Sequence, residues 1–228
     1  MSDKPASTEV VWDPDANPDD NYKWMAFSAA GIALVTMVMS FSIVFLALSS
    51  IADDFGVTLR AGSWVVIAQS LTIAALMLPL GRVADIVGRK KFHLVGMALF
   101  GGGAIFAALS PTLPILIVAR IVMAVGNSMG QAVGTAIIIS VFPTSERGKG
   151  LGGQTTAVAV GSAAGPIAAG LLLQIFSWRS LFVFMAIPIT IAFIWGYFIL
   201  DDKRIGSVKP VQIDRATTGL VRSFRPQA

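Results

Sequence analysis

Three polar side chains, Arg120, Asn127 and Gln131, follow one another at offsets of seven and four residues inside a long apolar segment. At 3.6 residues per turn, these offsets place all three on one face of a helix. An arginine inside a membrane span is costly unless it faces protein or water, so this face predicts a polar cavity that could bind a solute. The alternative is that Arg120, close to one end of the segment, extends to the membrane interface.

The stretch from Gly81 to Lys91, G-R-V-A-D-I-V-G-R-K-K, is a short cluster of charge between two apolar runs. Taken alone, a basic cluster of this kind suggests a contact with phosphate or nucleic acid. Because apolar segments long enough to cross a bilayer lie on both sides, we interpret it as a tight cytoplasmic turn between two membrane spans, and we expect no nucleic-acid partner.

Composition places the chain among membrane proteins. Of its 228 residues, 55% are hydrophobic and 13% are charged, whereas a soluble globular domain carries roughly 25% charged residues. The chain has no cysteine and one histidine, His93, so we expect no disulfide, no metal site and no cofactor. We also expect no enzyme activity, because the sequence offers no nucleophile with a plausible base and no phosphate-binding loop.

Six apolar segments are each close to the ~20 residues that span a hydrocarbon core. We predict that they are helices, because a backbone in lipid must satisfy its own hydrogen bonds. Continuous rather than alternating apolar runs argue against a β-barrel. The expected fold is an all-α membrane protein with a six-helix bundle over residues 23–200, whose segments are 24–50, 61–80, 92–110, 114–141, 150–175 and 180–200.

The distribution of lysine and arginine predicts the orientation. These residues gather in two connections and both tails, while the opposite side has only Arg60 and Arg179. Both termini should therefore be cytoplasmic, in a multi-pass protein of the cytoplasmic (inner) membrane. We expect residues 1–22 to form an acidic, disordered tail, with a docking segment as the alternative, and residues 201–228 to form a basic tail.

Small residues recur at four-residue spacing in the fourth and fifth segments, which lets helix backbones approach closely. Pro166 in the fifth segment predicts a kink. The acidic residues all lie in tails or connections; a proton-coupled carrier commonly has a carboxylate or histidine in its pathway, and we expect neither here. The small residues are Gly126, Gly130 and Gly134, then Ala157, Gly161, Gly165 and Ala169.

Gly81 to Lys91 resembles the signature loop between helices 2 and 3 of the major facilitator superfamily, on Gly81, Asp85, Gly88, Arg89 and Lys90. The fifth segment is similar to the antiporter motif of the drug:proton antiporters, on Gly152, Gly161, Gly165, Pro166 and Gly170. The segment from Trp178-Arg179 to Pro188 resembles the fourteen-helix drug-exporter branch.

Other positions match the family in part. Arg120 and Gly126 fall on its arginine motif, where Met123 and Ala124 replace the usual glutamine and glycine. Ser40 stands where the fourteen-helix branch typically has an aspartate.

Superfamily members have two six-helix halves with substrate bound between them. The resemblance therefore implies one half of that fold, half-size or N-terminal, which needs a second half from a like chain or a partner protein. It implies movement of a small organic solute or drug-like compound by alternating access. Residues 201–228 resemble the linker before a seventh helix. The resemblance also implies a cytoplasmic latch formed by Asp85, Arg89 and Lys90. It implies a substrate pathway that consists of Arg120, Asn127, Gln131, Thr36, Ser40 and Gln69.

Two alternatives stay open at this point. The chain could be a non-transporting structural or assembly subunit that retains the fold within a larger membrane complex. It could also be a truncated piece of a full carrier. The sequence leaves the substrate and the coupling ion undetermined.

Overall fold

The computed structural model describes residues 14–15, 19–201 and 205, so the two predicted tails lie almost entirely outside the described residues. Within these residues, seven α-helices and one short 3-10 helix follow one another. They are α1 (Asp20–Asp54), α2 (Leu59–Gly62), α3 (Trp64–Val87), α4 (Arg89–Ala108), α5 (Leu113–Val141), η1 (Thr144–Glu146), α6 (Arg147–Ile175) and α7 (Arg179–Ile199).

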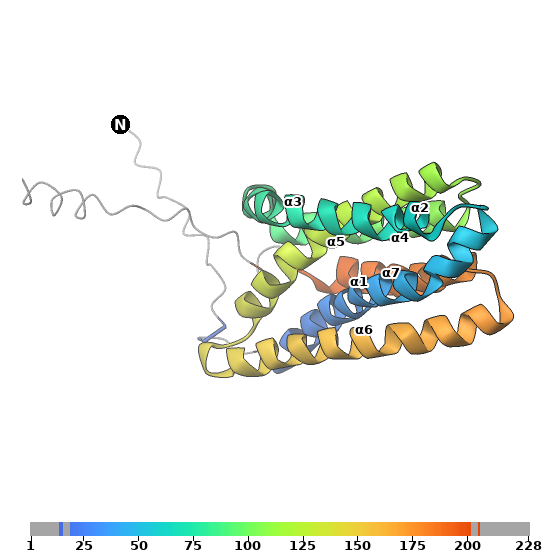
Figure 1. Ribbon diagram of the computed structural model, residues 1–228. Coiled ribbons are helices and arrows are strands. Elements are labelled where there is room, and N and C mark those ends of the chain that lie inside the picture. Colours follow the sequence, from blue (N-terminus) through green and yellow to red (C-terminus); the bar gives the residue numbers. More distant parts are fainter. Residues whose placement is uncertain (1–13, 16–18, 202–204, 206–228) are drawn as a thin grey trace, which may run out of the picture.

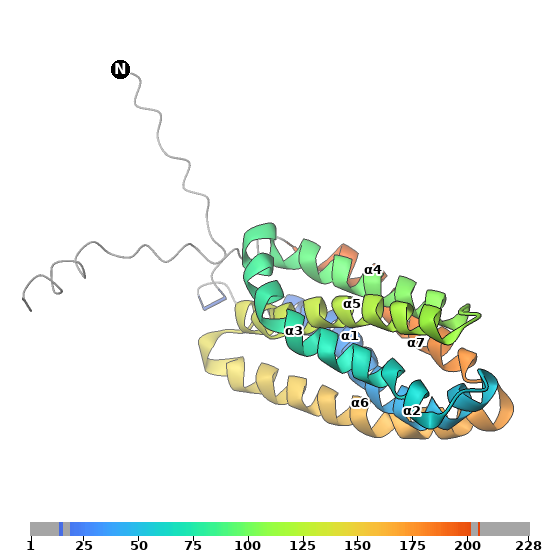
Figure 2. The same ribbon diagram turned by 45° about the horizontal axis from the view of Figure 1, so that its top comes forward.

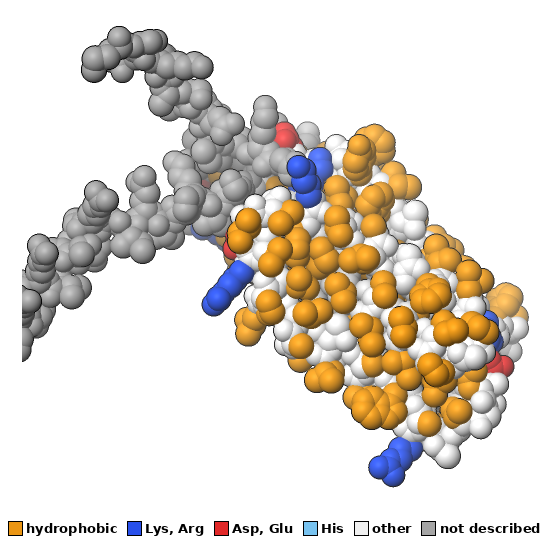
Figure 3. Space-filling view, turned by 90° about the horizontal axis from the view of Figure 1, so that it is seen from above, with side chains coloured by type: hydrophobic (Ala, Val, Ile, Leu, Met, Phe, Trp, Pro, Cys, Tyr) orange, Lys and Arg blue, Asp and Glu red, His pale blue; other side chains and the backbone are white. Residues whose placement is uncertain are grey.

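In the described part of the chain, six helical segments are long and apolar enough to cross a membrane, which confirms the predicted six-helix fold. The short helix α2 precedes α3 in the second of them, η1 precedes α6 in the fifth, and each of the other four spans is one helix. The helices extend beyond several predicted bounds, because helical hydrogen bonding continues past the apolar run into polar residues. Figure 3 shows hydrophobic side chains over the middle of one face and charged side chains at its two ends, as a bilayer requires.

The predicted loop from Gly81 to Lys91 is helical over most of its length, which corrects that prediction. α3 continues to Val87 and α4 begins at Arg89, so the turn consists of Gly88 alone. Gly88 has φ +104°, a conformation that residues with a Cβ rarely adopt, and its N–H still donates to the carbonyl of Ala84. One glycine is therefore enough to reverse the chain at this end.

The helices form a bundle with α3 and α6 at its two margins. α5 packs against α3 and α4, α4 also packs against α7, and α1 packs against α6 and α7. Figures 1 and 2 show α6 along one edge beside α1, with α3 on the other side of the bundle beside α5. α3 and α6 therefore each leave a long side without a neighbouring helix of the described chain.

Glycines bring pairs of helices into backbone contact. A Cβ on Gly126 of α5 would lie 2.6 Å from the backbone nitrogen of Phe100 in α4. A Cβ on Gly161 of α6 would lie 2.7 Å from the carbonyl oxygen of Val35 in α1. These distances are shorter than atoms tolerate, so the predicted close packing holds at both positions. α6 remains helical through Pro166.

Polar contacts fasten the two ends of the bundle. At one end, Asp54 of α1 accepts from Arg179 Nη1 at 2.7 Å and from Trp178 Nε1 at 3.0 Å. At the other end, Asp15 accepts from the backbone and side chain of Thr144, and these hydrogen bonds lower the pKa of that carboxyl. Lys23 pairs there with Asp20 and Glu146. The helices around the site are thus held at both ends.

Candidate functional site

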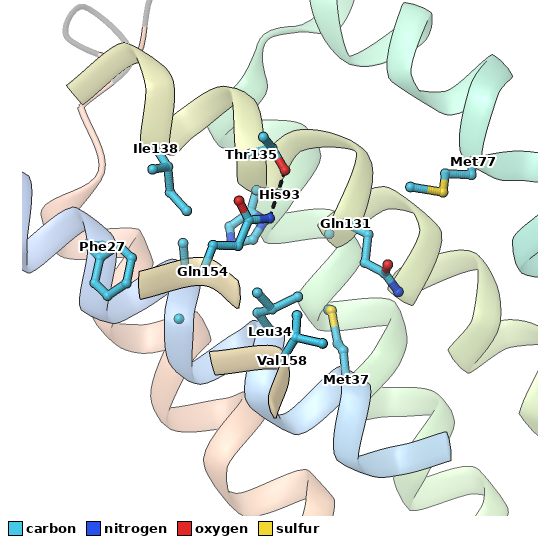
Figure 4. A pocket seen from close by; sticks show the side chains of 14 residues that line it. Phe27, Leu34, Met37, Met77, His93, Gln131, Thr135, Ile138, Gln154 and Val158 are labelled. Carbon is cyan, nitrogen blue, oxygen red and sulfur yellow. Dashed lines mark hydrogen bonds between the residues drawn. The ribbon is translucent and has the colours of Figure 1, made fainter. Parts of the chain in front are cut away.

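A cavity of about 130 Å³ lies between α1, α5 and α6, with one residue each from α3 and α4. Figure 4 shows its polar side chains, Gln131, Thr135, Gln154 and His93, among apolar ones. The full lining consists of Phe27, Ala30, Gly31, Leu34, Met37, Met77, His93, Gly130, Gln131, Gly134, Thr135, Ile138, Gln154 and Val158.

The cavity's amides are organised by hydrogen bonds. Gln154 Nε2 of α6 donates to Thr135 Oγ1 of α5 at 2.7 Å, and Gln131 Nε2 donates to Asn127 Oδ1 at 2.6 Å. Asn127 Nδ2 donates in turn to the carbonyl of Met37 in α1 at 3.4 Å. Of the predicted polar face, Gln131 therefore lines the cavity and Asn127 supports it from behind. The side-chain carbonyl oxygens of Gln131 and Gln154, the two amides that line the cavity, can each accept a further hydrogen bond.

Arg120 is fully buried within the bundle. Its Nη1 donates to Ser40 Oγ at 3.0 Å, and the guanidinium lies 5.7 Å from the ring centre of Phe182. Its Nε and Nη2 have no hydrogen-bond partner among the described residues. The side chain does not extend to the interface, so the structure favours the interpretation that Arg120 faces protein. It lies nearer the N-terminal end of α5 than the cavity residues of that helix and does not line the cavity.

The remaining predicted pathway residues are buried but separated. Thr36 donates to the carbonyl of Ile32 and lines a second, shallow and apolar groove between α1, α6 and α7. Gln69 of α3 is fully buried, and its amide has no hydrogen-bond partner in the described part of the chain. The structure thus pairs Ser40 with Arg120 and Asn127 with Gln131. The pathway role of the six residues stays a prediction.

The predicted latch residues lie at the junction of α3 and α4. Arg89 Nη2 and Asp85 Oδ1 are 3.3 Å apart, so these two pair within the bundle. Lys90 Nζ lies 5.9 Å from the ring centre of Tyr197 in α7. A Cβ on Gly81 would meet no described atom within 4 Å. Their action as a latch stays a prediction, as does the role of Gly88, which makes the turn.

The glycines of the fifth-segment motif fall into two groups. Gly161 and Gly165 are buried against α1, where Cβ atoms would contact Val35 and Ser42. Cβ atoms on Gly152 and Gly170 would meet no described atom within 4 Å. Within this bundle, the motif therefore serves close packing at its centre and leaves its two outer glycines open.

His93 is the residue that sequence reasoning missed. It lies in α4, only 2% exposed, and lines the same cavity as Gln131. We expected no histidine in the pathway, and His93 nevertheless lines the cavity beside Gln131, one of the predicted pathway residues. The sequence marks His93 only as a single histidine near the start of an apolar segment. The residues that follow it in α4 are mostly glycine and apolar ones, so no periodic polar face indicates that His93 lies at a site.

A sequence model of the Major Facilitator Superfamily matches residues 30–226. The chain is 34% identical over 169 residues to the riboflavin transporter RibZ of Clostridioides difficile, covering 74% of this chain and 37% of that protein. It is 29% identical over 184 residues to the multidrug efflux pump LfrA of Mycolicibacterium smegmatis, covering 80% and 36%.

Solved structures share the fold. A bacterial homologue of the human lysosomal transporter Spinster superposes with a TM-score of 0.68 at 17% identity, over 91% of this chain and 49% of that chain. A POT family transporter, solved in complex with a thioalcohol-conjugated peptide, gives a TM-score of 0.70 at 16% identity, over 88% of this chain and 43% of that chain. The chain thus spans a little over a third of the length of the two relatives and less than half of these transporter chains.

Proposed function

Because the chain belongs to the Major Facilitator Superfamily, we propose that it is one six-helix half of a carrier for a small organic solute. A second six-helix bundle, from a like chain or a partner protein, covers the open side of the cavity. The two bundles rock against each other in the cytoplasmic membrane and expose the cavity to each side in turn. The basic residues at the α3–α4 and α5–α6 ends favour a cytoplasmic side for these ends and, with an even number of spans, for both termini.

The observation that carries this proposal is the contrast between the exposed side of the first half of α6 and that of α7; the second half of α6 exposes Ile167, Leu171 and Ile175. From residue 152 to 163, α6 exposes small or hydroxyl-bearing residues and only two larger ones, Val158 and Val160. α7 exposes large apolar residues such as Ile187, Ile191 and Phe198. Small residues suit contact with another helix, and bulky ones suit lipid. The exposed small residues of α6 are Gly152, Thr155, Thr156, Ala159, Ser162 and Ala163.

Burial along the spans supports the same side. Within the most apolar window of each span, 17% of residues are buried in α3 and in α6, against 56% in α4 and in α5. The two least buried helices flank the cavity, which takes Met77 from α3 and Gln154 from α6. A two-fold axis along the membrane normal, which relates superfamily halves, sets α3 of one bundle against α6 of the other.

The chemistry of the cavity supports an organic solute with hydrogen-bonding groups. Two amides and one hydroxyl provide donors and acceptors, while Phe27, Met37 and Met77 provide apolar contact. No carboxylate belongs to the described lining, so nothing there selects for a cation by direct pairing. The relative that carries riboflavin in its name makes riboflavin a reasonable first probe.

Flux of fluorescent probes tests the proposal. We expect inside-out membrane vesicles containing the protein to move riboflavin or ethidium faster than vesicles without it. Gln131→Leu tests whether flux uses this cavity, because it removes an amide from the cavity wall. It should slow flux at least about tenfold, which corresponds to the loss of about 1.5 kcal/mol of hydrogen bonding. Equal flux in vesicles with and without the protein, for both probes, would contradict the proposal.

A further inference from the structure

The cavity and the apolar groove between α1, α6 and α7 meet at one side chain. The cavity encloses about 130 Å³ and the groove about 610 Å³, and both linings include Phe27 and Gly31. Because glycine has no side chain, Phe27 is the one side chain that these two described linings share. A Cβ on Gly153 would lie 2.6 Å from Phe27 Cζ, so the ring lies against α6 and closes the passage between the two spaces.

The Phe27 ring can turn without moving a helix. Phe27 is half-buried, and it borders the cavity on one side and the groove on the other. Figure 4 shows the ring at the margin of the cavity. Edge-to-face contacts hold it in place, with ring centres 5.8 Å from Trp24 and 6.1 Å from Phe142. Such aromatic contacts are modest in strength, so a ligand that fills both spaces can displace the ring.

The groove provides volume and apolar surface. Its volume lies within the ~300–1,000 Å³ that is usual for small-molecule sites, whereas the cavity alone is smaller than that range. The three hydroxyl protons of the groove are already used. Ser28 donates to the carbonyl of Met25 and accepts from Trp195 Nε1. Thr36 and Thr156 each donate to a carbonyl in the preceding turn of their own helix.

The cavity provides polar groups that still need partners. His93 is 2% exposed, and neither Nδ1 nor Nε2 has a hydrogen-bond partner among the described residues. A neutral imidazole has one donor and one acceptor, and leaving them unpaired is costly. Gln131 and Gln154 each have a carbonyl oxygen that can accept as well. Apart from His93, no acidic or basic side chain belongs to the described lining of either space, so the partner they suit is an uncharged group that both donates and accepts.

We propose that the cavity and the groove become one amphipathic site when the Phe27 ring turns aside. Its ligand is an uncharged amphiphile with an amide-type head and an apolar body. The head binds beside His93 and Gln154, and the body lies in the groove against residues such as Val160 and Phe184. Phe27 thereby determines how large a ligand the bundle accepts. Transport of this ligand rests on the proposed carrier function, whereas its binding does not.

Photolabelling of the full chain in nanodiscs tests the site without any transport. The probe is a benzophenone that carries a primary amide on a short alkyl chain, and the reference probe has a methyl group in place of the amide. We expect the amide probe to label groove residues of α6 and α7 saturably, as mass spectrometry of the labelled peptides detects. Its half-saturating concentration should be at least about tenfold lower than that of the reference probe, because the amide adds hydrogen bonds in the cavity.

Variants of each compartment test whether the two act as one site. Ala157 lines the groove and not the cavity, so Ala157→Phe should fill the groove and weaken saturable labelling at least about tenfold. Gln154→Leu removes a partner of the head in the cavity, and should weaken labelling by the amide probe about tenfold without affecting the reference probe. Ile191→Phe, exposed on α7 and outside the groove, is the matched control and should change neither.

Two results would overturn the proposal. Equal labelling of the groove by both probes, unchanged in Gln154→Leu, would show that the groove holds any lipid-soluble chain. Absence of groove labelling would show that lipid or another protein chain covers it against the amide probe.

Phe27→Leu tests the partition itself. It keeps an apolar side chain and removes the ring, so the half-saturating concentration of the amide probe should fall severalfold, because the cost of turning the ring aside is removed. An unchanged concentration in a folded Phe27→Leu protein would overturn the role of Phe27. If thermal unfolding shows that this variant does not fold, Ala157→Phe and Gln154→Leu decide the proposal.

Flux separates this site from the carrier function. Saturable labelling of the groove in a protein that moves neither riboflavin nor ethidium would leave the site intact and contradict the carrier proposal with these probes. Flux of either probe without saturable labelling of the groove would overturn the site and leave the carrier intact.

Discussion

Replacing Gly161 with leucine is expected to separate α6 from α1 and to remove most folded protein from the membrane. A Cβ at this position would already lie 2.7 Å from the carbonyl oxygen of Val35 and 3.3 Å from its Cα, so the backbone of α1 itself would have to move. Overpacking that only side chains absorb costs about 1–3 kcal/mol, and we expect at least the upper value here. Thermal unfolding in mild detergent, followed by tryptophan fluorescence, measures the loss.

Gly170→Leu is the matched control for this change. Gly170 belongs to the same helix and to the same sequence motif, yet a Cβ there would meet no described atom within 4 Å. Because glycine in a helix interior costs roughly 0.5–1 kcal/mol relative to alanine, Gly170→Leu should leave the stability equal or slightly higher. Equal destabilisation by the two variants would show that the motif glycines do not divide as the structure divides them.

The second large effect is expected from Arg120. Arg120→Met should keep the bundle folded and slow probe flux about 10- to 100-fold. This is the effect of losing a hydrogen bond from a charged group, which contributes about 1.5–3 kcal/mol of binding free energy. The guanidinium is fully buried and holds Ser40 through one hydrogen bond, while Nε and Nη2 are unpartnered among the described residues. If Arg120 belongs to the predicted pathway, these two nitrogens are the donors available to a solute. Methionine fills similar volume without the charge.

Stability distinguishes a pathway role from a structural one. Removing a buried charge in favour of an apolar residue of similar size is often neutral or stabilising, so Arg120→Met should unfold at the parent's temperature or higher. Arg120→Ala instead leaves a cavity and should cost about 2–5 kcal/mol. Arg120→Met with full flux would remove Arg120 from the predicted pathway, and Arg120→Met that fails to fold would assign it to the scaffold.

The spans and the family were predictable because each depends on local sequence. A run of about 20 apolar residues has few ways to exist in lipid other than as a helix. The spacing of Arg120, Asn127 and Gln131 on α5 identified one face, and the structure confirms that Asn127 and Gln131 are hydrogen-bonded along it. The extent of helix through Gly81–Val87 was not predictable from hydropathy, because charged residues continue a helix outside the membrane as readily as they form a loop.

The composition of the cavity could not be predicted in the same way. His93 reaches the cavity only because α4 approaches α5 at Gly96 and Gly126, and that approach is a relation between two helices rather than a property of either. Likewise, Gly161 and Gly170 are equivalent in the motif and differ only in what lies opposite them. Sequence spacing gives the face of a helix, and the packing partner decides what that face does.

On the proposed function, the side formed by α3 and α6 receives a second six-helix bundle. A photo-crosslinking amino acid placed at Ser162, exposed on α6, or at Ala74, exposed on α3, tests it in intact membranes when linked peptides are identified by mass spectrometry. Ile191, exposed on α7, is the matched control. We predict links from positions 162 and 74 to helices of a second bundle, with residue 162 linked to α3 if that bundle is a like chain, and lipid adducts alone from position 191. Lipid adducts alone at all three positions would contradict the account.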